Sequence, residues 1–351
     1  MKKWRVVSIS IVACVLAACT VNDHDGQSQL QIEQPKLQED NILEVQADDT
    51  LYTAPFTGIT LAEPLEQRPF LVTMNNHPQA RPQSGISAAD IVYEMLAEGD
   101  VTRFLALFQS ELPENIGPVR SARSYFVDIA KGLDSFYVAH GYSPEAQTML
   151  QQQVVDHING MQYDGTLFKR ASHRVAPHNS YITSENILAG ASQVNASMRY
   201  NEKVSYTFYE DQESVKIGEV ANGVAVQYGN ASFNSTYEYD EQRKTYARFS
   251  GGVATIDELN EQQVQVANIL FFEMPHQIID DKGRRHINID VGGKAYIVQH
   301  GTKREVAWTN RDGLLVAIEQ SGEDVKLVPG KTWIHFVPTT PGLTSAVTIT
   351  Q

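Results

Sequence analysis

The sequence predicts an α+β protein, in which a mixed α/β-layered N-terminal domain precedes a smaller, β-rich antiparallel domain with one short helix. Between residues 51 and 198, short apolar runs alternate with stretches whose apolar residues recur at helical spacing. Between 199 and 351, most apolar runs are short and bounded by Gly, Asn, Asp or Pro, which is typical of strands. Roughly 300 residues are enough to bury two hydrophobic cores.

The first 18 residues predict a signal peptide. Lys2, Lys3 and Arg5 form a positive start, an apolar run covers 6–15, and Leu-Ala-Ala-Cys occupies 16–19. This end resembles the lipobox of bacterial lipoproteins, and the resemblance implies cleavage before Cys19 and a diacylglyceryl group on its sulfur. The alternative is an ordinary secretory signal in which Cys19 has no such role.

Residues 19–50 predict a disordered tether. After Cys19 they are rich in Gln, Asp, Glu and Asn and contain no aromatic residue, so they cannot bury enough apolar surface to offset their ordering entropy. No later stretch is long and apolar enough to be a membrane span. The tether would therefore connect the folded part to a lipid anchor at Cys19, on the extracytoplasmic face of the cell membrane.

Composition narrows the classes of function. The chain has a formal net charge of −14, and loss of the signal peptide removes three cations, which leaves −17. A protein this acidic is a poor general binder of nucleic acid. Its two cysteines are Cys14, inside the signal peptide, and Cys19. The mature chain therefore has no disulfide, no Cys nucleophile and no Cys-based metal site.

The first domain is expected to mix strands and helices. Apolar runs predict strands at 70–75, 91–96, 101–108 and 136–140. The second and third of these are joined by a tight connection, which predicts a hairpin. Apolar residues at helical spacing between 122 and 133 predict a helix. Ser143, followed by Pro144, predicts the start of another.

The second domain is expected to be mostly strand. The predicted strands are 204–209, 224–228, 236–239, 246–249, 269–273, 286–291, 295–300, 314–318 and 332–337. Residues 257–264 predict its short helix. The boundary between the two domains is expected between 195 and 204.

The strongest candidate for a binding site is the segment 117–123, Gly-Pro-Val-Arg-Ser-Ala-Arg. Ser121 is expected to cap the following helix, which places Arg120 and Arg123 beside a positive helix end that disfavours cations. Two guanidinium groups next to free N–H groups form a site suited to phosphate or carboxylate. The alternative is that both arginines pair with carboxylates of the same domain.

The predicted hairpin offers such a carboxylate. If Leu96 pairs with Val101 across the turn, Glu94 lies opposite Arg103, and an opposite-charge cross-strand pair contributes about 0.2–1 kcal/mol. Glu94 is otherwise a candidate acid or base, or a residue that orients an arginine. Glu98, in the turn itself, is expected to be solvated.

Two further basic positions follow in the sequence. His140 ends a predicted strand, where layered α/β folds commonly hold ligands; it is either a weak candidate base or a hydrogen-bonded structural residue. The segment 169–179 is basic and aperiodic, which predicts a loop. Its Arg170, His173 and Arg174 extend the positive face if the loop folds over the earlier arginines, and are otherwise solvated. The sequence contains no metal-ligand spacing and no cofactor motif, so neither is expected.

Eight short segments carry a family resemblance. They are 81–85, 89–94, 98–99, 102–104, 117–123 and 140–141 in the first domain, and Trp308 and 327–333 in the second. Through them, everything after the tether resembles the YerB-like family of bacterial lipoproteins. The resemblance implies two α+β domains, and it implies no molecular activity.

These features predict a non-catalytic envelope lipoprotein that binds an anionic ligand or a protein partner through its arginine-lined face. The alternative is a cell-wall enzyme, a hydrolase or phosphoglycosyl transferase acting on a phosphate-bearing glycan or lipid-linked substrate. Arg103, Arg120 and Arg123 would then hold the phosphate, with Glu94 or His140 as the base. A third hypothesis, a scaffold for other proteins, predicts an exposed apolar patch on the β-rich domain.

Overall fold

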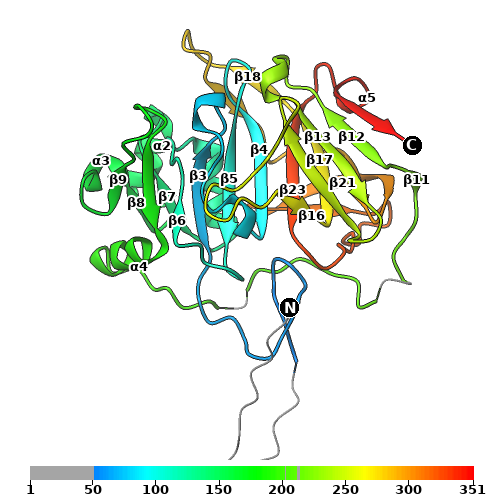
Figure 1. Cartoon of the computed structure of the whole chain (residues 1–351), viewed down its shortest axis with the longest axis horizontal. Coiled ribbons are helices and arrows are strands. Elements are labelled where there is room, and N and C mark those ends of the chain that lie inside the picture. The colour runs from blue at the N-terminus through cyan, green and yellow to red at the C-terminus, as the bar shows by residue number, and fades with distance from the viewer. Residues whose placement is uncertain (1–50, 202, 212–213) are drawn as a thin grey trace, which may run out of the picture. The chain divides into compact units, whose positions relative to one another are not determined.

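One large mixed sheet, built from both halves of the chain, is the framework of the fold (Figure 1). The computed structural model describes residues 51–201, 203–211 and 214–351. The predicted signal peptide, the tether and Cys19 lie outside these residues. The sheet contains eleven strands, and with the helices described below it confirms the α+β class.

The first half of the chain supplies five strands to this sheet: β3 (Phe70–Asn75), β4 (Ile91–Glu98), β5 (Val101–Phe108), β7 (Phe136–Ala139) and β8 (His157–Asn159). The strands β3, β4 and β5 are buried along nearly their whole length, because their sequences are apolar on both faces. The predicted strands at 70–75 and 101–108 and the hairpin of β4 and β5 are confirmed.

The second half supplies six strands to the same sheet: β11 (Glu219–Val220), β17 (Asn268–Met274), β20 (Gly293–Gln299), β21 (Thr302–Arg311), β22 (Leu314–Ile318) and β23 (Thr332–Pro338). The strand β23 pairs in parallel with β17 on one side and with β4 on the other. In Figure 1 the blue-to-cyan strands of the first half meet the red strands of the second half at this pairing. The two halves therefore share backbone hydrogen bonds.

A second, six-stranded sheet comes entirely from the second half. Its strands are β12 (Gly223–Val226), β13 (Ser235–Asp240), β14 (Thr245–Ser250), β15 (Val253–Ala254), β16 (Gln265–Val266) and β24 (Val347–Thr350). Burial alternates along β14, so that Tyr246, Arg248 and Ser250 face the core. One hydrophobic cluster joins this sheet to the large one, through Tyr237 and Tyr246 on one side and Phe104 and Trp333 on the other.

The helices are short and lie mainly in the first half. They are α1 (Ser124–Gly132), α2 (Pro144–Gln151), α3 (Gly160–Tyr163), α4 (Ser184–Gln193) and α5 (Leu343–Ala346). Single 3₁₀ turns cover Pro78–Ala80, Ile86–Ala88 and Ala231–Phe233. The remaining strands form three small sheets: β1 (Tyr52–Thr53) with β2 (Thr60–Leu61); β6 (Asn115–Ile116), β10 (Ser180–Thr183) and β9 (Phe168–Arg170); and β18 (His276–Ile278) with β19 (Arg285–Ile287).

The prediction of a helix at 257–264 is wrong. The segment is a turn, because the Asp257 carboxylate accepts hydrogen bonds from the backbone N–H groups of Gly85 and Ser87 and from Leu259. These bonds hold the segment against the first half of the chain. The short helix of the second half is α5 instead.

The predicted position of Glu94 opposite Arg103 is also wrong. Glu94 pairs with Phe104 across the hairpin, and Arg103 pairs with Met95. The turn is shorter than predicted: Glu98 pairs with Val101, so only Gly99 and Asp100 form it. After the irregularity between Leu96 and Glu98, the strands lie one residue out of the predicted register. A one-residue shift moves a side chain to the other face of a sheet, so Glu94 points into the space between the two sheets.

Glu94 is the centre of a buried polar network. Its Oε2 accepts hydrogen bonds from the Arg248 guanidinium at 2.7 Å, from the Trp333 indole at 3.0 Å and from Ser235 at 3.1 Å. Its Oε1 accepts from Thr102 and from the Asn76 amide. Both charged side chains are completely buried. Burial alone would raise the pKa of Glu94, but Arg248 lowers it below its usual range.

We expect Glu94→Gln to lower the free energy of unfolding by about 3–5 kcal/mol, because it leaves the Arg248 guanidinium buried without its counter-charge. The control is Glu305→Gln, which removes a mostly exposed partner of Lys303 and should cost at most about 1 kcal/mol. Urea unfolding of both variants measures the difference. Equal costs for the two substitutions would show that the buried pair has no special role.

His335, which lies beside this network, is expected to make stability depend on pH. Burial lowers the pKa of His335 to about 3. The Glu94 carboxylate opposes this shift, and the positive charge of Arg248 offsets part of the effect of Glu94. Tyr228 and Tyr237 hydroxyls contact its two ring nitrogens at 2.8 and 2.7 Å. Below pH 6.5, His335 is protonated in the unfolded chain but stays neutral in the folded chain. The free energy of unfolding therefore decreases as the pH falls from about 6.5 toward 3.

Chemical unfolding of the protein and of His335→Gln at several pH values between 7 and 4 tests this. The variant should have a shallower decline, by up to about 1.4 kcal/mol per pH unit. His276, whose pKa burial lowers to about 4, is present in both proteins and cancels in the comparison. Parallel pH profiles would contradict the assignment to His335.

Candidate functional site

The polar residues that follow β3 and β7 lie at one edge of the large sheet. These two strands are parallel neighbours, so the residues after their carboxyl ends meet at the same edge, where layered sheets commonly hold ligands. Asn75 ends β3 and is followed by Asn76 and His77, and His140 follows β7. His77 caps the 3₁₀ turn at Pro78–Ala80.

Arg120 is inserted between the ends of these strands. Its backbone N–H donates to the carbonyl of Thr73 in β3 at 2.8 Å, and its own carbonyl accepts from the N–H of His140 at 2.9 Å. The backbone thus fixes the position of Arg120 at the edge where the polar residues meet. Burial and the nearby Arg103 lower the pKa of Arg120 to about 10.

The guanidinium of Arg120 has no acceptor within the described ranges. Its Nε is buried without a hydrogen-bond partner. Within residues 51–201, 203–211 and 214–351, the Arg120 side chain forms no ion pair and no hydrogen bond. A buried donor that is left unsatisfied costs about 1–3 kcal/mol, and more when it is charged. Arg120 is therefore an unneutralised cation that the fold positions at a cost.

Three histidines surround this cation. The rings of His77 and His178 stack with centroids 4.5 Å apart. Burial first, and then the positive charges of Arg81 and Arg120, lower the pKa of His77. Burial, His77 and Arg120 do the same for His178. We call Arg120, His77, His140 and His178 the Arg120 cluster.

Two of these histidines have a ring N–H group that no described residue accepts. The Asn75 amide nitrogen can only donate, so His178 accepts from it at Nδ1, at 2.8 Å. His77 accepts at Nδ1 from the backbone N–H of Gln79. Because both rings have a lowered pKa and are neutral at pH 7, the proton of each lies on Nε2. Both Nε2–H groups are without a partner among the described residues.

His140 is occupied by its neighbours. The Arg170 guanidinium can only donate, so it donates to His140 Nε2 at 3.0 Å, and His140 Nδ1–H donates to the Ser180 hydroxyl at 2.7 Å. Burial and Arg170 lower its pKa, against the opposing effect of Asp164. His140 is thus a neutral ring with both nitrogens bonded.

Arg123, the other arginine of the segment 117–123, is neutralised, and so is Arg103 in β5. The Glu98 carboxylate pairs with Arg103 at 2.6 Å and also with Arg123, so the prediction that Glu98 is merely solvated is wrong. Arg123 is itself the N-cap of α1 and makes no capping hydrogen bond from its side chain. The prediction that Ser121 caps this helix is also wrong, because the Ser121 hydroxyl donates to the carbonyl of His140.

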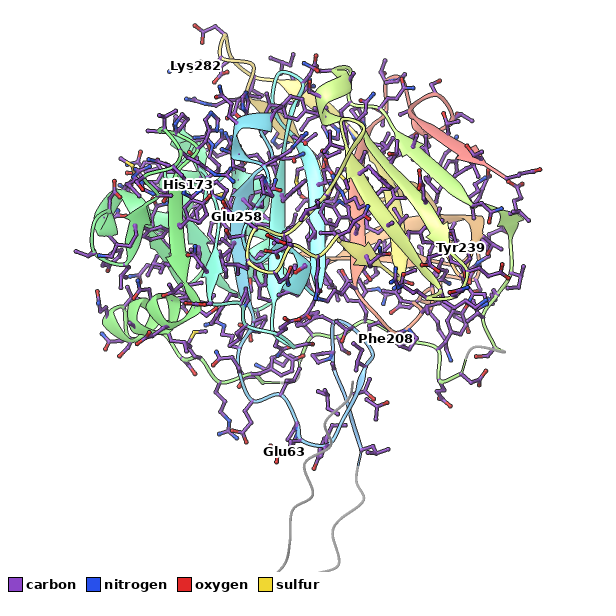
Figure 2. The ribbon with its side chains drawn as sticks, in the orientation of Figure 1. Glu63, His173, Phe208, Tyr239, Glu258 and Lys282 are labelled. Carbon is purple, nitrogen blue, oxygen red and sulfur yellow. The ribbon has the colours of Figure 1, made fainter. Side chains whose placement is uncertain are left out.

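The basic loop does fold beside the Arg120 cluster, and it brings acids with it. Arg170 pairs with Asp164 at 2.8 Å. His173 and Arg174 both contact Glu258, at 3.0 and 3.2 Å, and Figure 2 shows His173 and Glu258 beside each other. Arg170, His173 and Arg174 therefore each have a carboxylate partner, whereas Arg120 has none among the described residues.

Glu94 is not available for acid–base chemistry. Its two oxygens accept five hydrogen bonds in all, including one from Arg248, and the side chain is fully buried. A general base needs reach to a substrate proton, and this carboxylate has none. Of the two bases that the enzyme hypothesis names, Glu94 and His140, only His140 remains.

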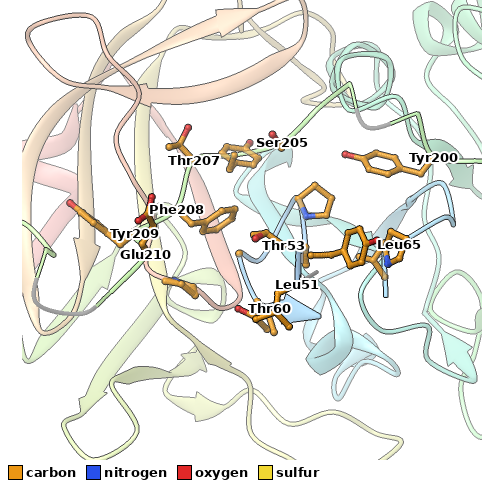
Figure 3. Close-up of a pocket in the computed structure, with 18 residues that line it drawn as sticks. Leu51, Thr53, Thr60, Leu65, Tyr200, Ser205, Thr207, Phe208, Tyr209 and Glu210 are labelled. Atoms are coloured by element: carbon orange, nitrogen blue, oxygen red, sulfur yellow. The ribbon is translucent and has the colours of Figure 1, made fainter. Parts of the chain in front are cut away.

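A groove of the described chain lies away from these charges. It has a volume of about 970 Å³ and lies between β1–β2 and the segment 205–210. Figure 3 shows Leu65, Tyr200 and Phe208 around it. Glu210 is the one charged residue that lines it in the described chain, so it contains no acid–base pair or anion site.

The described residues contain neither a helix fit to cross a membrane nor a cluster fit to hold a metal ion. None of the helices there has the length and apolar character needed to cross a membrane. No group of three or more His, Cys, Asp or Glu side chains in that part of the chain is arranged to hold a metal ion.

Sequence reasoning found Arg120 but missed His77. The signal was present, because Asn75 and Asn76 end a buried strand and His77 follows them directly. His178 lies in the basic segment 169–179, and no spacing in that segment matches a metal motif. Only the fold brings His178 to His77, across a hundred residues of sequence.

Comparison with known proteins gives the family. Residues 56–197 match the family model described as "Protein of unknown function (DUF3048) N-terminal domain", and residues 224–334 match the model described as its C-terminal domain. The chain belongs to the DUF3048 family. The Arg120 cluster lies wholly within the N-terminal match, whereas the Glu94–Arg248 pair joins the two matches.

Members of this family include a named relative and a solved structure. The chain is 39% identical over 342 residues to "Putative lipoprotein YerB" of Bacillus subtilis (strain 168), which covers 96% of each protein. It is also similar to the crystal structure of the YerB protein from Bacillus subtilis, with a TM-score of 0.78 and 42% identity over 86% of this chain and all of that one. The resemblance to the YerB-like family is confirmed.

Proposed function

We propose that this DUF3048 protein is a lipid-anchored envelope lipoprotein that binds an anionic ligand at the Arg120 cluster. The anchor rests on the sequence at 16–19, which has the lipobox pattern, and on the name of the relative in Bacillus subtilis. Acylated Cys19 would hold the protein on the extracytoplasmic face of the cell membrane. Two acyl chains provide stable attachment where one is marginal.

The observation that supports anion binding is the unsatisfied guanidinium of Arg120. Glu98 neutralises both Arg103 and Arg123, so the fold does place a carboxylate beside the neighbouring arginines. Arg120 receives none and is instead placed beside two neutral histidines whose Nε2–H groups point to no partner in the described chain. Three donors without acceptors match the several oxygens of a phosphate or carboxylate.

Catalysis is not part of this proposal. Glu94 is committed to Arg248, and His140 has both ring nitrogens bonded. The hydrolase and phosphoglycosyl transferase hypotheses therefore have no free base among their named candidates. Binding of a phosphate- or carboxylate-bearing component of the envelope needs only the donors described above.

Arg120→Gln should weaken binding to cell-wall fractions and to inorganic pyrophosphate by at least about tenfold, because a charge-assisted hydrogen bond contributes roughly 1.5–3 kcal/mol. Cosedimentation and isothermal titration calorimetry measure the two affinities. The control is Arg199→Gln, which removes the same charge from an exposed side chain. Its affinity should stay within about twofold of the unchanged protein, and an equal loss in both variants would reject the site.

The anchor has its own matched pair of variants. Cys19→Ala should abolish incorporation of labelled palmitate and release the protein from the membrane fraction, because it removes the acylated sulfur. Cys14→Ala alters the only other cysteine of the chain and should leave both unchanged. A Cys19→Ala protein that remains acylated and membrane-bound would contradict the proposed anchor.

A further inference from the structure

A small cavity opens between the two halves of the chain. It has a volume of about 220 Å³ and is lined by residues that follow β3, among them Asn76 and Arg81, and by the end of β14 and the residues after it. It shares no residue with the Arg120 cluster. The inference drawn from it is therefore independent of the function proposed above.

One wall of the cavity carries a hydroxyl that has no partner among the described residues. Ser250 is the last residue of β14 and faces inward because burial alternates along this strand. It is 3% exposed, and its Oγ is buried without any hydrogen bond. Buried hydroxyls in folded proteins nearly always have a partner, so this one is a position that a ligand can fill.

Arg81 supplies the charge. Its Nε and Nη2 donate to Asn76, at 2.8–3.1 Å, and its guanidinium lies 5.7 Å from the centre of the Phe233 ring. No carboxylate in the described part of the chain pairs with it: the nearest acid in its surroundings, Glu94, is taken by Arg248. Its Nη1 remains free to donate.

Gln83 and Thr255 also line the cavity, but the Gln83 amide donates to Asn75 and the Thr255 hydroxyl accepts from Arg248. The remaining lining residues are apolar. Pro82, Val253, Ala254 and Ile256 contribute to the wall. Val253 is 70% exposed and Ile256 38% exposed, so apolar surface also borders the opening. A cation and a hydroxyl in the lining of a mainly apolar cavity favour a ligand with one charged head and a short hydrocarbon part.

We propose that this cavity binds a small carboxylate with a short apolar chain, with the carboxylate on Arg81 and Ser250 and the chain against Val253 and Ile256. A phosphate is disfavoured because the cavity provides one cation and a mainly apolar wall, where a doubly charged group loses its hydration. The volume lies below the roughly 300–1,000 Å³ of pockets that hold drug-sized ligands. The apolar part therefore has only a few carbon atoms.

Two sources offer this chemistry: a free short-chain acid, or the C-terminal residue of a peptide with an apolar side chain. Isovalerate is the probe for the first, and N-acetyl-leucine is the probe for the second. N-acetyl-leucinamide has the shape of the second probe without the charge. Titration of the whole protein with each, followed by calorimetry, separates the sources.

We expect one or both carboxylates to bind and the amide to bind at least about tenfold more weakly. Arg81→Gln should weaken carboxylate binding by about tenfold or more, through loss of a charge-assisted hydrogen bond. Lys282→Gln removes the same charge from an exposed residue remote from the cavity lining and should change it by less than about twofold.

Ser250→Ala keeps the test decisive if Arg81→Gln lowers stability. Because the Ser250 hydroxyl has no partner, its removal should leave the unfolding midpoint unchanged while weakening carboxylate binding by about threefold or more. The inference is overturned if neither carboxylate binds at about 10 mM, if the amide binds equally well, or if Ser250→Ala binds like the unchanged protein.

Discussion

The buried ion pair between Glu94 and Arg248 is the interaction on which the rest of this fold depends. Both side chains are fully buried, and a desolvated pair is tolerated only when the remaining hydrogen-bonding positions are also filled. Trp333, Ser235 and Thr102 fill them here. Glu94 lies in the N-terminal family match, and Arg248 and Trp333 lie in the C-terminal one. The C-terminal part thus supplies the counter-charge of the buried Glu94, and the N-terminal part supplies that of the buried Arg248.

The same pair positions the surface where ligands are proposed to bind. The side-chain amide nitrogen of Asn76 donates to Glu94 and to Thr102. The backbone carbonyl and the side-chain Oδ1 of Asn76 both accept from Arg81. The loop that begins at Asn76 is thereby fixed to the core at its first residue. His77, at the start of the loop, faces Arg120 and His178, and Arg81, further along it, lines the small cavity. One buried network thus supports two separate groups of donors.

Sequence reasoning worked where the pattern was local. The strands at 70–75 and 101–108 could be predicted because their apolar runs are continuous and bounded by polar residues, and Arg120 stands out in a short segment with a second arginine, Arg123. It failed where long-range contacts decide. The two-residue turn between Glu98 and Val101, followed by an irregularity in β4, has no signature in the sequence, so the sequence predicts the wrong partner for Glu94. Arg248 is 154 residues away from it, and Glu258 reaches the basic loop from the second half. No spacing rule connects such positions.

A cation that receives no acid from its own fold is the feature most open to direct observation. A crystal of the protein soaked in selenate, an oxyanion with a strong anomalous signal, should show a peak within hydrogen-bond distance of the Arg120 guanidinium and of the Nε2 atoms of His77 and His178. The same crystal of Arg120→Gln should lack that peak. Selenate bound only at exposed lysines, with the space beside Arg120 filled by ordered water alone, would contradict the presence of an anion site.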